Sequence, residues 1–183
     1  MLCCKFFYGC FFYVVFGYRV HLCLCLVLNV YFAAHETREK KVTLFDEVLI
    51  PYLNGYLKKT TRGVCFLHLI GSHEPAFVRY PYDGAPFNTA NADLKSSNKP
   101  FLANNHYDNS IWYTDKVLEQ VICELEALHK PCWMAYFSDH GETPSAKSWR
   151  TMSDRDLWDV PFIIWTSKEF VKMYPEKISR LKR

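Results

Sequence analysis

The chain has 183 residues, which is enough for one domain with a proper core and short for two. Its formal net charge of +3 is mild, so charge alone indicates no strongly acidic partner. The aromatic residues gather in apolar runs and do not interleave with a basic patch, so we expect no nucleic-acid partner.

Residues 1–34 form an apolar leader that differs in composition from the rest of the chain. Between residues 6 and 34 this leader carries one formal charge, Arg19. Its length suits one membrane span of about 20 residues, although an arginine near the centre of a span costs about 2.5–3.5 kcal/mol. We therefore expect 1–34 to be a candidate transmembrane segment. The alternatives are a buried apolar segment, or an N-terminus that does not represent a complete natural protein.

The next stretch predicts a helix, a strand and a long loop. Apolar residues recur at helical spacing over 44–57, and Pro51 is expected to break or kink this helix. The run GVCFLHLI, residues 63–70, predicts a buried strand that ends in a polar loop. The loop predicted over 71–105 is rich in Pro, Asn, Ser and Tyr, and a loop of that length is uncommon and usually functional.

The second half of the chain repeats the alternation of helix and strand. An amphipathic pattern predicts a helix over about 105–129, and the apolar runs 132–138 and 160–167 predict two more buried strands. Helices that alternate with fully apolar strands predict an α/β fold with a mostly parallel sheet. Ligands bind beyond the carboxyl ends of such strands, so the loops LIGSHEP and FSDHGE are expected to converge there.

Beyond the leader, the cysteines indicate neither a zinc knuckle nor a disulfide framework. Residues 35–183 contain Cys65, Cys123 and Cys132, and no C-x-x-C pair. Cys65 and Cys132 lie in predicted strands, where we expect small buried thiols.

Asp139 and His140 stand side by side at the end of a predicted strand, with Gly141 next. Zinc accepts carboxylate oxygen together with imidazole nitrogen. Neighbours on a strand point to opposite faces, so both side chains reach one ion only where the backbone turns, which Gly141 permits. The pair is therefore either a metal site or the polar cap of a strand end. His73 is either a ligand-binding group or a solvated loop histidine.

Three stretches carry a family resemblance: HLIGSHEPAFVRYP, NNHYDNSIWYTDKVLEQVI and YFSDHGE. In this order and spacing they resemble the C-terminal half of the phosphoethanolamine transferases, in the alkaline phosphatase and sulfatase superfamily. The resemblance covers about 43–167, and it implies that 35–183 is a partial catalytic domain of that type. The implied fold is an incomplete α/β/α sandwich with a mostly parallel sheet, preceded by the apolar leader.

The resemblance also implies a function in the bacterial cell envelope. Members of the family sit in the inner membrane with the catalytic domain on the periplasmic side. They move phosphoethanolamine from phosphatidylethanolamine to a lipopolysaccharide or glycan acceptor. A zinc-bound threonine attacks the donor phosphorus and forms a phosphoenzyme, so Zn²⁺ is the implied cofactor.

Four residues are matched to the family motifs by this resemblance. Asp139 and His140 match two zinc ligands. His73 matches a histidine that lies near the transferred group or a second metal, and it would stabilise a phosphoryl oxygen. Asn109 matches the start of the YDNS helix, where it either contacts substrate or caps the helix and fixes the loop over the site.

The chain also departs from the family pattern. No strand–turn–helix precedes residue 43 to present a threonine nucleophile, Thr60 and Thr61 lie ahead of a strand at its wrong end, and Thr143 matches no family nucleophile. Catalytic zinc usually has three protein ligands, whereas two are matched here. We therefore expect a truncated or degenerate transferase part that is weakly active or inactive alone, or one that another chain completes. The alternatives are a sulfatase or phosphodiesterase-type hydrolase and a non-catalytic, membrane-anchored binding module.

Overall fold

The computed structural model describes residues 10–16, 28–32, 45–73, 75–87, 100–141 and 158–181. Side chains are described for 45–73, 75–87, 104–141 and 158–181. In chain order the elements are β1 (Cys10–Phe16), β2 (Leu28–Phe32), the 3-10 helix η1 (Asp46–Leu49), α1 (Ile50–Lys59), β3 (Gly63–Leu69), the 3-10 helix η2 (Ala76–Val78), α2 (Pro100–Glu126), β4 (Cys132–Ser138), β5 (Phe162–Thr166), α3 (Lys168–Met173) and α4 (Pro175–Leu181).

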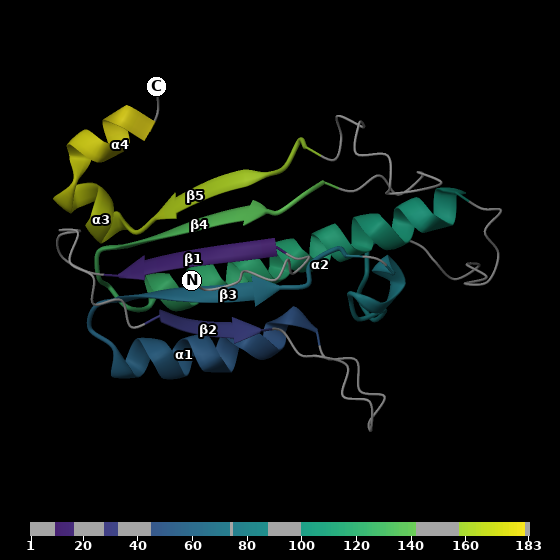
Figure 1. The fold of residues 1–183 in the computed structure, drawn as a ribbon, viewed down its shortest axis with the longest axis horizontal. Helices are drawn as coiled ribbons and strands as arrows, with labels where there is room; N and C mark the ends of the chain where they lie inside the picture. The colour runs from purple at the N-terminus through teal and green to yellow at the C-terminus, as the bar shows by residue number, and fades with distance from the viewer. Residues whose placement is uncertain are drawn as a thin grey trace, which may run out of the picture.

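The five strands form one sheet in the order β2-β3-β1-β4-β5. Strands β2, β3 and β4 point in one direction, whereas β1 and β5 point in the other (Figure 1). Of the neighbouring pairs, β2–β3 is parallel and β1–β3, β1–β4 and β4–β5 are antiparallel. The α/β class is confirmed, but the prediction of a mostly parallel sheet is wrong for these strands.

The error has a physical origin. Strands β3 and β4 do run in the same direction, as a connection through helix α2 requires. The sequence pattern did not predict that an apolar strand from the leader would lie between them in the opposite direction. A fully apolar strand is buried on both faces in either orientation, so its composition does not reveal its direction.

Strands β1 and β2 both belong to the range 1–34 that was predicted as a candidate transmembrane segment. Both strands pair with strands of the later part of the chain, β1 with β3 and β4, and β2 with β3. Among the helices that the structure describes, none is long and apolar enough to cross a membrane. The transmembrane assignment of 1–34 stays a prediction.

The helices differ from their predictions mainly at their ends. The helix predicted over 44–57 divides into the 3-10 helix η1 and the helix α1 just before Pro51, which lies in the first turn of α1, where a missing N–H costs no helical hydrogen bond. Helix α2 begins at Pro100, inside the stretch that was predicted to be loop. The predicted strands 63–70, 132–138 and 160–167 correspond to β3, β4 and β5. The prediction that 160–167 is buried is wrong, because β5 is the last strand of the sheet and its Phe162 is 65% exposed.

The hydrophobic core lies between helices α1 and α2 and one face of the sheet, and Figure 1 shows α2 running behind the strands. The central aliphatic contacts come from Leu53 of α1, Leu67 of β3 and Val121 of α2, each at most 1% exposed. Cys65 and Cys132 lie in this core as the sequence predicted. Burial raises the pKa of the Cys65 thiol to about 12, so this thiol stays protonated and unreactive at neutral pH.

The junction of α1 and β3 yields a test of this packing. Tyr56 donates a hydrogen bond from its hydroxyl to the Val64 carbonyl, at 3.2 Å. A Cβ added at Gly63 would overlap that hydroxyl. We expect Gly63→Ala to displace the Tyr56 ring and to lower the free energy of unfolding by about 1–3 kcal/mol, measured by urea denaturation.

Gly55→Ala is the matched control, because a Cβ at this position in α1 meets no atom within 4 Å. It should raise the free energy of unfolding by about 0.5–1 kcal/mol, since alanine favours a helix interior over glycine. Equal effects of the two substitutions would contradict the contact between Tyr56 and the start of β3.

Candidate functional site

The carboxyl ends of β3 and β4 lie at the same edge of the sheet. Cys10 of β1 is the register partner of both Leu69, the last residue of β3, and Ser138, the last residue of β4. Strand β1 lies between β3 and β4, so the carboxyl ends of β3 and β4 are about 10 Å apart. The loops that carry His73 and Asp139-His140 therefore leave the sheet side by side (Figure 1), which confirms the predicted convergence. We call this edge the site edge.

Asp139 and His140 lie in a bend just after β4 ends. The Asp139 Oδ1 atom is 3.9 Å from His140 Nε2 and also accepts a hydrogen bond from the His140 backbone N–H, at 3.0 Å. Two atoms that each lie about 2.0–2.2 Å from one zinc ion can be at most about 4.4 Å apart. The turn therefore brings one oxygen and one nitrogen close enough to share an ion.

The backbone around this turn fixes the orientation of the His140 ring. Its Nδ1 lies 2.8 Å from the Gly141 carbonyl oxygen, which can only accept, so Nδ1 carries the proton. The neutral ring then presents the Nε2 lone pair, as a metal-ligating histidine does. Ser138 adds a hydrogen bond from its hydroxyl to the His140 carbonyl, at 2.6 Å.

The described residues bring no third Cys, His, Asp or Glu into a group with this pair. Thr60 and Thr61 lie just before β3 begins, at the end of the strand opposite the site edge, as predicted. Thr143 lies outside the described residues. Among the described residues, Asp139 and His140 are thus a pair of donors that can share an ion, without a third member in the group.

His73 lies in the turn that follows β3. Its backbone N–H donates to the Ile70 carbonyl at 3.3 Å, and its carbonyl accepts from Arg79 Nε at 2.8 Å. Asp46 also bonds to this turn, through the backbone N–H groups of Ile70 and Gly71. Sequence reasoning missed Asp46 and Arg79, because their partners are backbone atoms that no motif encodes.

Asn109 lies inside α2 and is fully buried, at 0% exposure. Its Oδ1 accepts from the Phe87 N–H at 3.0 Å, and its Nδ2 donates to the Phe87 carbonyl at 2.9 Å and to the Tyr80 hydroxyl at 3.2 Å. Because α2 begins at Pro100, the expected role of Asn109 as a helix cap is wrong. These bonds favour the other structural role, in which Asn109 fixes the loop over the site.

His106 lies one turn earlier on α2 and belongs to the same polar cluster. Its Nδ1 is 2.7 Å from the Tyr80 hydroxyl, and its ring is 6% exposed and surrounded by Phe77, Tyr80 and Tyr82. Burial lowers the pKa of this imidazole, so the neutral form is favoured. Sequence reasoning missed His106 as well, since only the fold brings 80 and 106 together.

The hydrogen bonds of Asn109 generate a prediction about the loop. Asn109→Ala removes all three bonds to Tyr80 and Phe87, so the Phe87 amide should exchange its hydrogen about tenfold faster or more. Hydrogen exchange read by NMR measures this directly. Asn104→Ala, at an exposed position of the same helix, is the control. Unchanged exchange at Phe87 would contradict the loop-fixing role.

The lowered pKa of His106 predicts a pH dependence of stability. The unfolded chain, with a histidine pKa of about 6.5, takes up this proton more readily than the folded chain. The free energy of unfolding should therefore fall as the pH drops below about 6.5, and it should fall less in His106→Gln. Urea denaturation from about pH 7.5 to about pH 5 measures the difference, with exposed His129→Asn as control. If the free energy of unfolding fell by the same amount in wild type and in His106→Gln over this pH range, the lowered pKa of His106 would be contradicted.

Comparison with known proteins identifies the family of this chain. The profile of the sulfatase family matches residues 27–182, which is most of the chain. Phosphoethanolamine transferase EptA of Helicobacter pylori is 32% identical over 137 residues, covering 69% of this chain and 26% of the relative. Phosphoethanolamine transferase EptC of Escherichia coli strain K12 is 29% identical over 156 residues, covering 80% of this chain and 27% of the relative.

A third relative, phosphoethanolamine transferase EptA of Salmonella typhimurium, is 29% identical over 143 residues, covering 71% of this chain and 26% of its own length. The chain thus spans about a quarter of the length of these curated relatives. No solved structure matches the chain. The chain belongs to the sulfatase family, and its relatives place it with that family's phosphoethanolamine transferases.

Proposed function

We propose that this chain contributes part of the metal-binding and phosphoryl-binding edge of a phosphoethanolamine transferase. Asp139 and His140 would hold a zinc ion, His73 would stabilise a phosphoryl oxygen, and Asn109 would hold the loop over the site. The observation that carries the proposal is the 3.9 Å between Asp139 Oδ1 and His140 Nε2, at the edge where the His73 turn also leaves the sheet.

The two donors fit a zinc ion in chemistry and spacing. Carboxylate oxygen and imidazole nitrogen are both common zinc ligands, and the Gly141 carbonyl already orients the ring as a ligand requires. A bound zinc ion supplies Lewis acidity, which lowers the pKa of an attacking hydroxyl and offsets phosphoryl charge. His73, when protonated, can donate a hydrogen bond to a phosphoryl oxygen from the neighbouring turn.

The names of the relatives support phosphoethanolamine as the group that is moved. We propose phosphatidylethanolamine as the donor and a lipopolysaccharide or glycan of the cell envelope as the acceptor. The corresponding location is the bacterial inner membrane, with the domain on the periplasmic side. The three-layer sandwich of the superfamily is part of the same proposal.

Two donors hold zinc less tightly than the three or four of a complete site. The chain by itself should therefore bind zinc weakly and transfer little or no phosphoethanolamine, and another chain is a candidate to supply the remaining groups. A sulfatase or phosphodiesterase-type hydrolase would reveal itself by cleaving sulfate or phosphate diesters. A non-catalytic membrane-anchored module would bind lipid or glycan equally well with a chelator present.

Zinc titration of the purified chain tests the proposal. Wild type should take up zinc reversibly, and the double variant Asp139→Ala/His140→Ala should bind it at least about tenfold more weakly, because both donors are lost. Calorimetry gives the affinity, and metal analysis after gel filtration gives the stoichiometry.

The matched control is Asp159→Ala/His129→Asn, which removes one exposed carboxylate and one exposed imidazole elsewhere. Asparagine suits position 129 because the backbone there has φ 51°. Equal zinc affinity in wild type and in the Asp139/His140 double variant would contradict the role of Asp139 and His140 as zinc ligands. Phosphoethanolamine transfer by the chain alone at rates typical of enzymes would refute the expected weak activity.

A further inference from the structure

A buried carboxylate outside the family motifs is bonded to the turn that carries His73. Asp46 is the first residue of η1 and is 7% exposed. Its Oδ1 accepts a hydrogen bond from the Ile70 N–H at 3.0 Å, and its Oδ2 accepts one from the Gly71 N–H at 2.8 Å. Both oxygens of one carboxylate are thus committed to consecutive amides where β3 ends.

Arg79 holds the other side of the same turn. Its Nε donates to the His73 carbonyl at 2.8 Å, and its positive charge attracts the Asp46 carboxylate. The turn between them is tight, since Gly71 has φ 61° and the His73 N–H donates back to the Ile70 carbonyl. We call Asp46, Arg79 and the turn 70–73 the clamp.

The charge of Asp46 matters to the clamp. Burial raises the pKa of this carboxyl, and the hydrogen bonds from the two backbone amides and the charge of Arg79 offset only part of that rise. An ionised carboxylate accepts at both oxygens, but a protonated acid turns one oxygen into a donor, which faces an amide N–H that also donates. Replacing the carboxylate by an amide of the same shape should therefore loosen one of the two bonds and remove the attraction to Arg79.

The geometry points to Asp46 and Arg79 as positioning residues that hold His73 toward the site edge beside Asp139 and His140. This inference deepens the proposed function and rests on it, because it assigns the clamp to phosphoryl binding by His73. The residues of the clamp come from η1, the turn after β3 and the segment after η2, so the clamp also ties η1 to the site. The three hydrogen bonds that define the clamp are made by Asp46 and Arg79 to the turn after β3, so the inference predicts that the clamp variants keep their zinc affinity.

The test separates phosphoryl binding from zinc binding. The variants Asp46→Asn and Arg79→Gln are compared with wild type and with Asp83→Asn, a control at an exposed position of the same segment. In the presence of zinc, O-phosphoethanolamine is titrated while NMR follows the His73 imidazole signals. Both clamp variants should respond with an affinity about tenfold weaker, while zinc affinity stays at the wild-type value.

A second readout needs no ligand. In both clamp variants the Gly71 and His73 amides should exchange faster and the His73 imidazole signals should shift or broaden, whereas the control stays as wild type. If Asp46→Asn does not fold, Arg79→Gln decides, because it leaves the buried carboxylate in place and releases the His73 carbonyl.

The outcomes distinguish the two proposals. Unchanged His73 signals and amide exchange in the clamp variants would overturn the clamp, and so would an equal loss of zinc and O-phosphoethanolamine affinity, which indicates general damage. Wild type that binds neither zinc nor O-phosphoethanolamine would overturn the proposed function, and with it the assignment of the clamp to phosphoryl binding. If the clamp variants bind O-phosphoethanolamine more weakly but keep the zinc affinity of wild type, the result supports both the clamp and the proposed function.

Discussion

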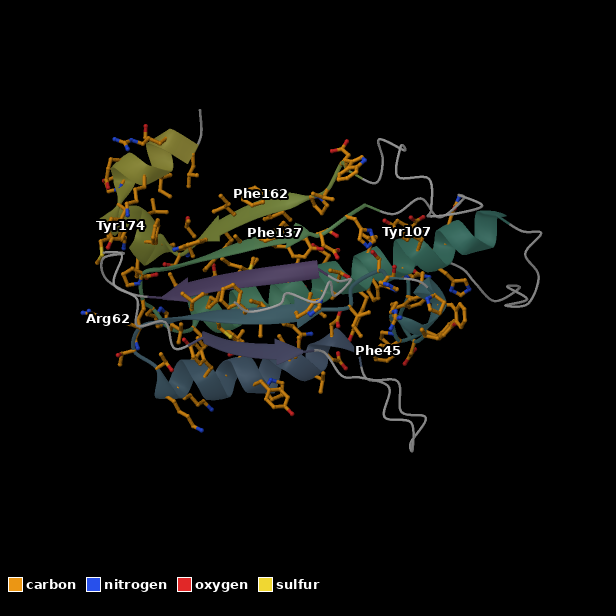
Figure 2. All side chains as sticks on the ribbon, viewed as in Figure 1. Phe45, Arg62, Tyr107, Phe137, Phe162 and Tyr174 are labelled. Carbon is orange, nitrogen blue, oxygen red and sulfur yellow. The ribbon has the colours of Figure 1, made fainter. Side chains whose placement is uncertain are left out.

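Strands β3 and β4 run in the same direction and end at one edge of the sheet, and the arrangement of the candidate site depends on this alignment. The connection through α2 sets it, because a helix that packs on one face returns the chain to the same starting end. The side chains of α2 and of both strands share one core, so the two ends cannot shift independently. In Figure 2, Phe137 and Phe162 lie beside each other on β4 and β5, with ring centroids 6.1 Å apart, and this cross-strand contact lies outside the core because Phe162 is 65% exposed.

Buried polar groups hold the described part of the loop after β3, which comprises 70–73 and 75–87. Asn109 gives its whole amide to the Phe87 backbone and Tyr80, and Asp46 gives both oxygens to the turn after β3. A buried polar group without a partner costs more than its hydrogen bond contributes, so each of these groups favours one loop conformation strongly. The long polar stretch after β3 is therefore attached to the scaffold at several separate points.

The chemistry at the site edge divides between two loops. The β4 loop supplies a carboxylate oxygen and an imidazole nitrogen 3.9 Å apart. The turn after β3 carries a second imidazole, and strand β1 lies between β3 and β4. In the proposed function, the cation and the His73 imidazole would contact different oxygens of one phosphoryl group. Among the described residues, Asp139 and His140 lie close enough to share an ion, and no third donor joins them in a group. A zinc site commonly has three or four protein ligands, so we expect weak metal binding by this chain alone.

Sequence by itself determined the family, the positions of β3, β4, β5 and α2, and the residues of the Asp139-His140 turn. Those features are local: apolar runs, helical spacing and a short motif are written in consecutive residues. Tertiary structure decided the direction of β1 and β5, the loop-fixing role of Asn109, and the contributions of Asp46, Arg79, Tyr80 and His106. Strand direction depends on which neighbour completes the sheet, and these polar contacts join residues 6 to 29 positions apart, often through backbone atoms. No pattern in consecutive residues records such pairings, because they arise only when packing brings distant segments together.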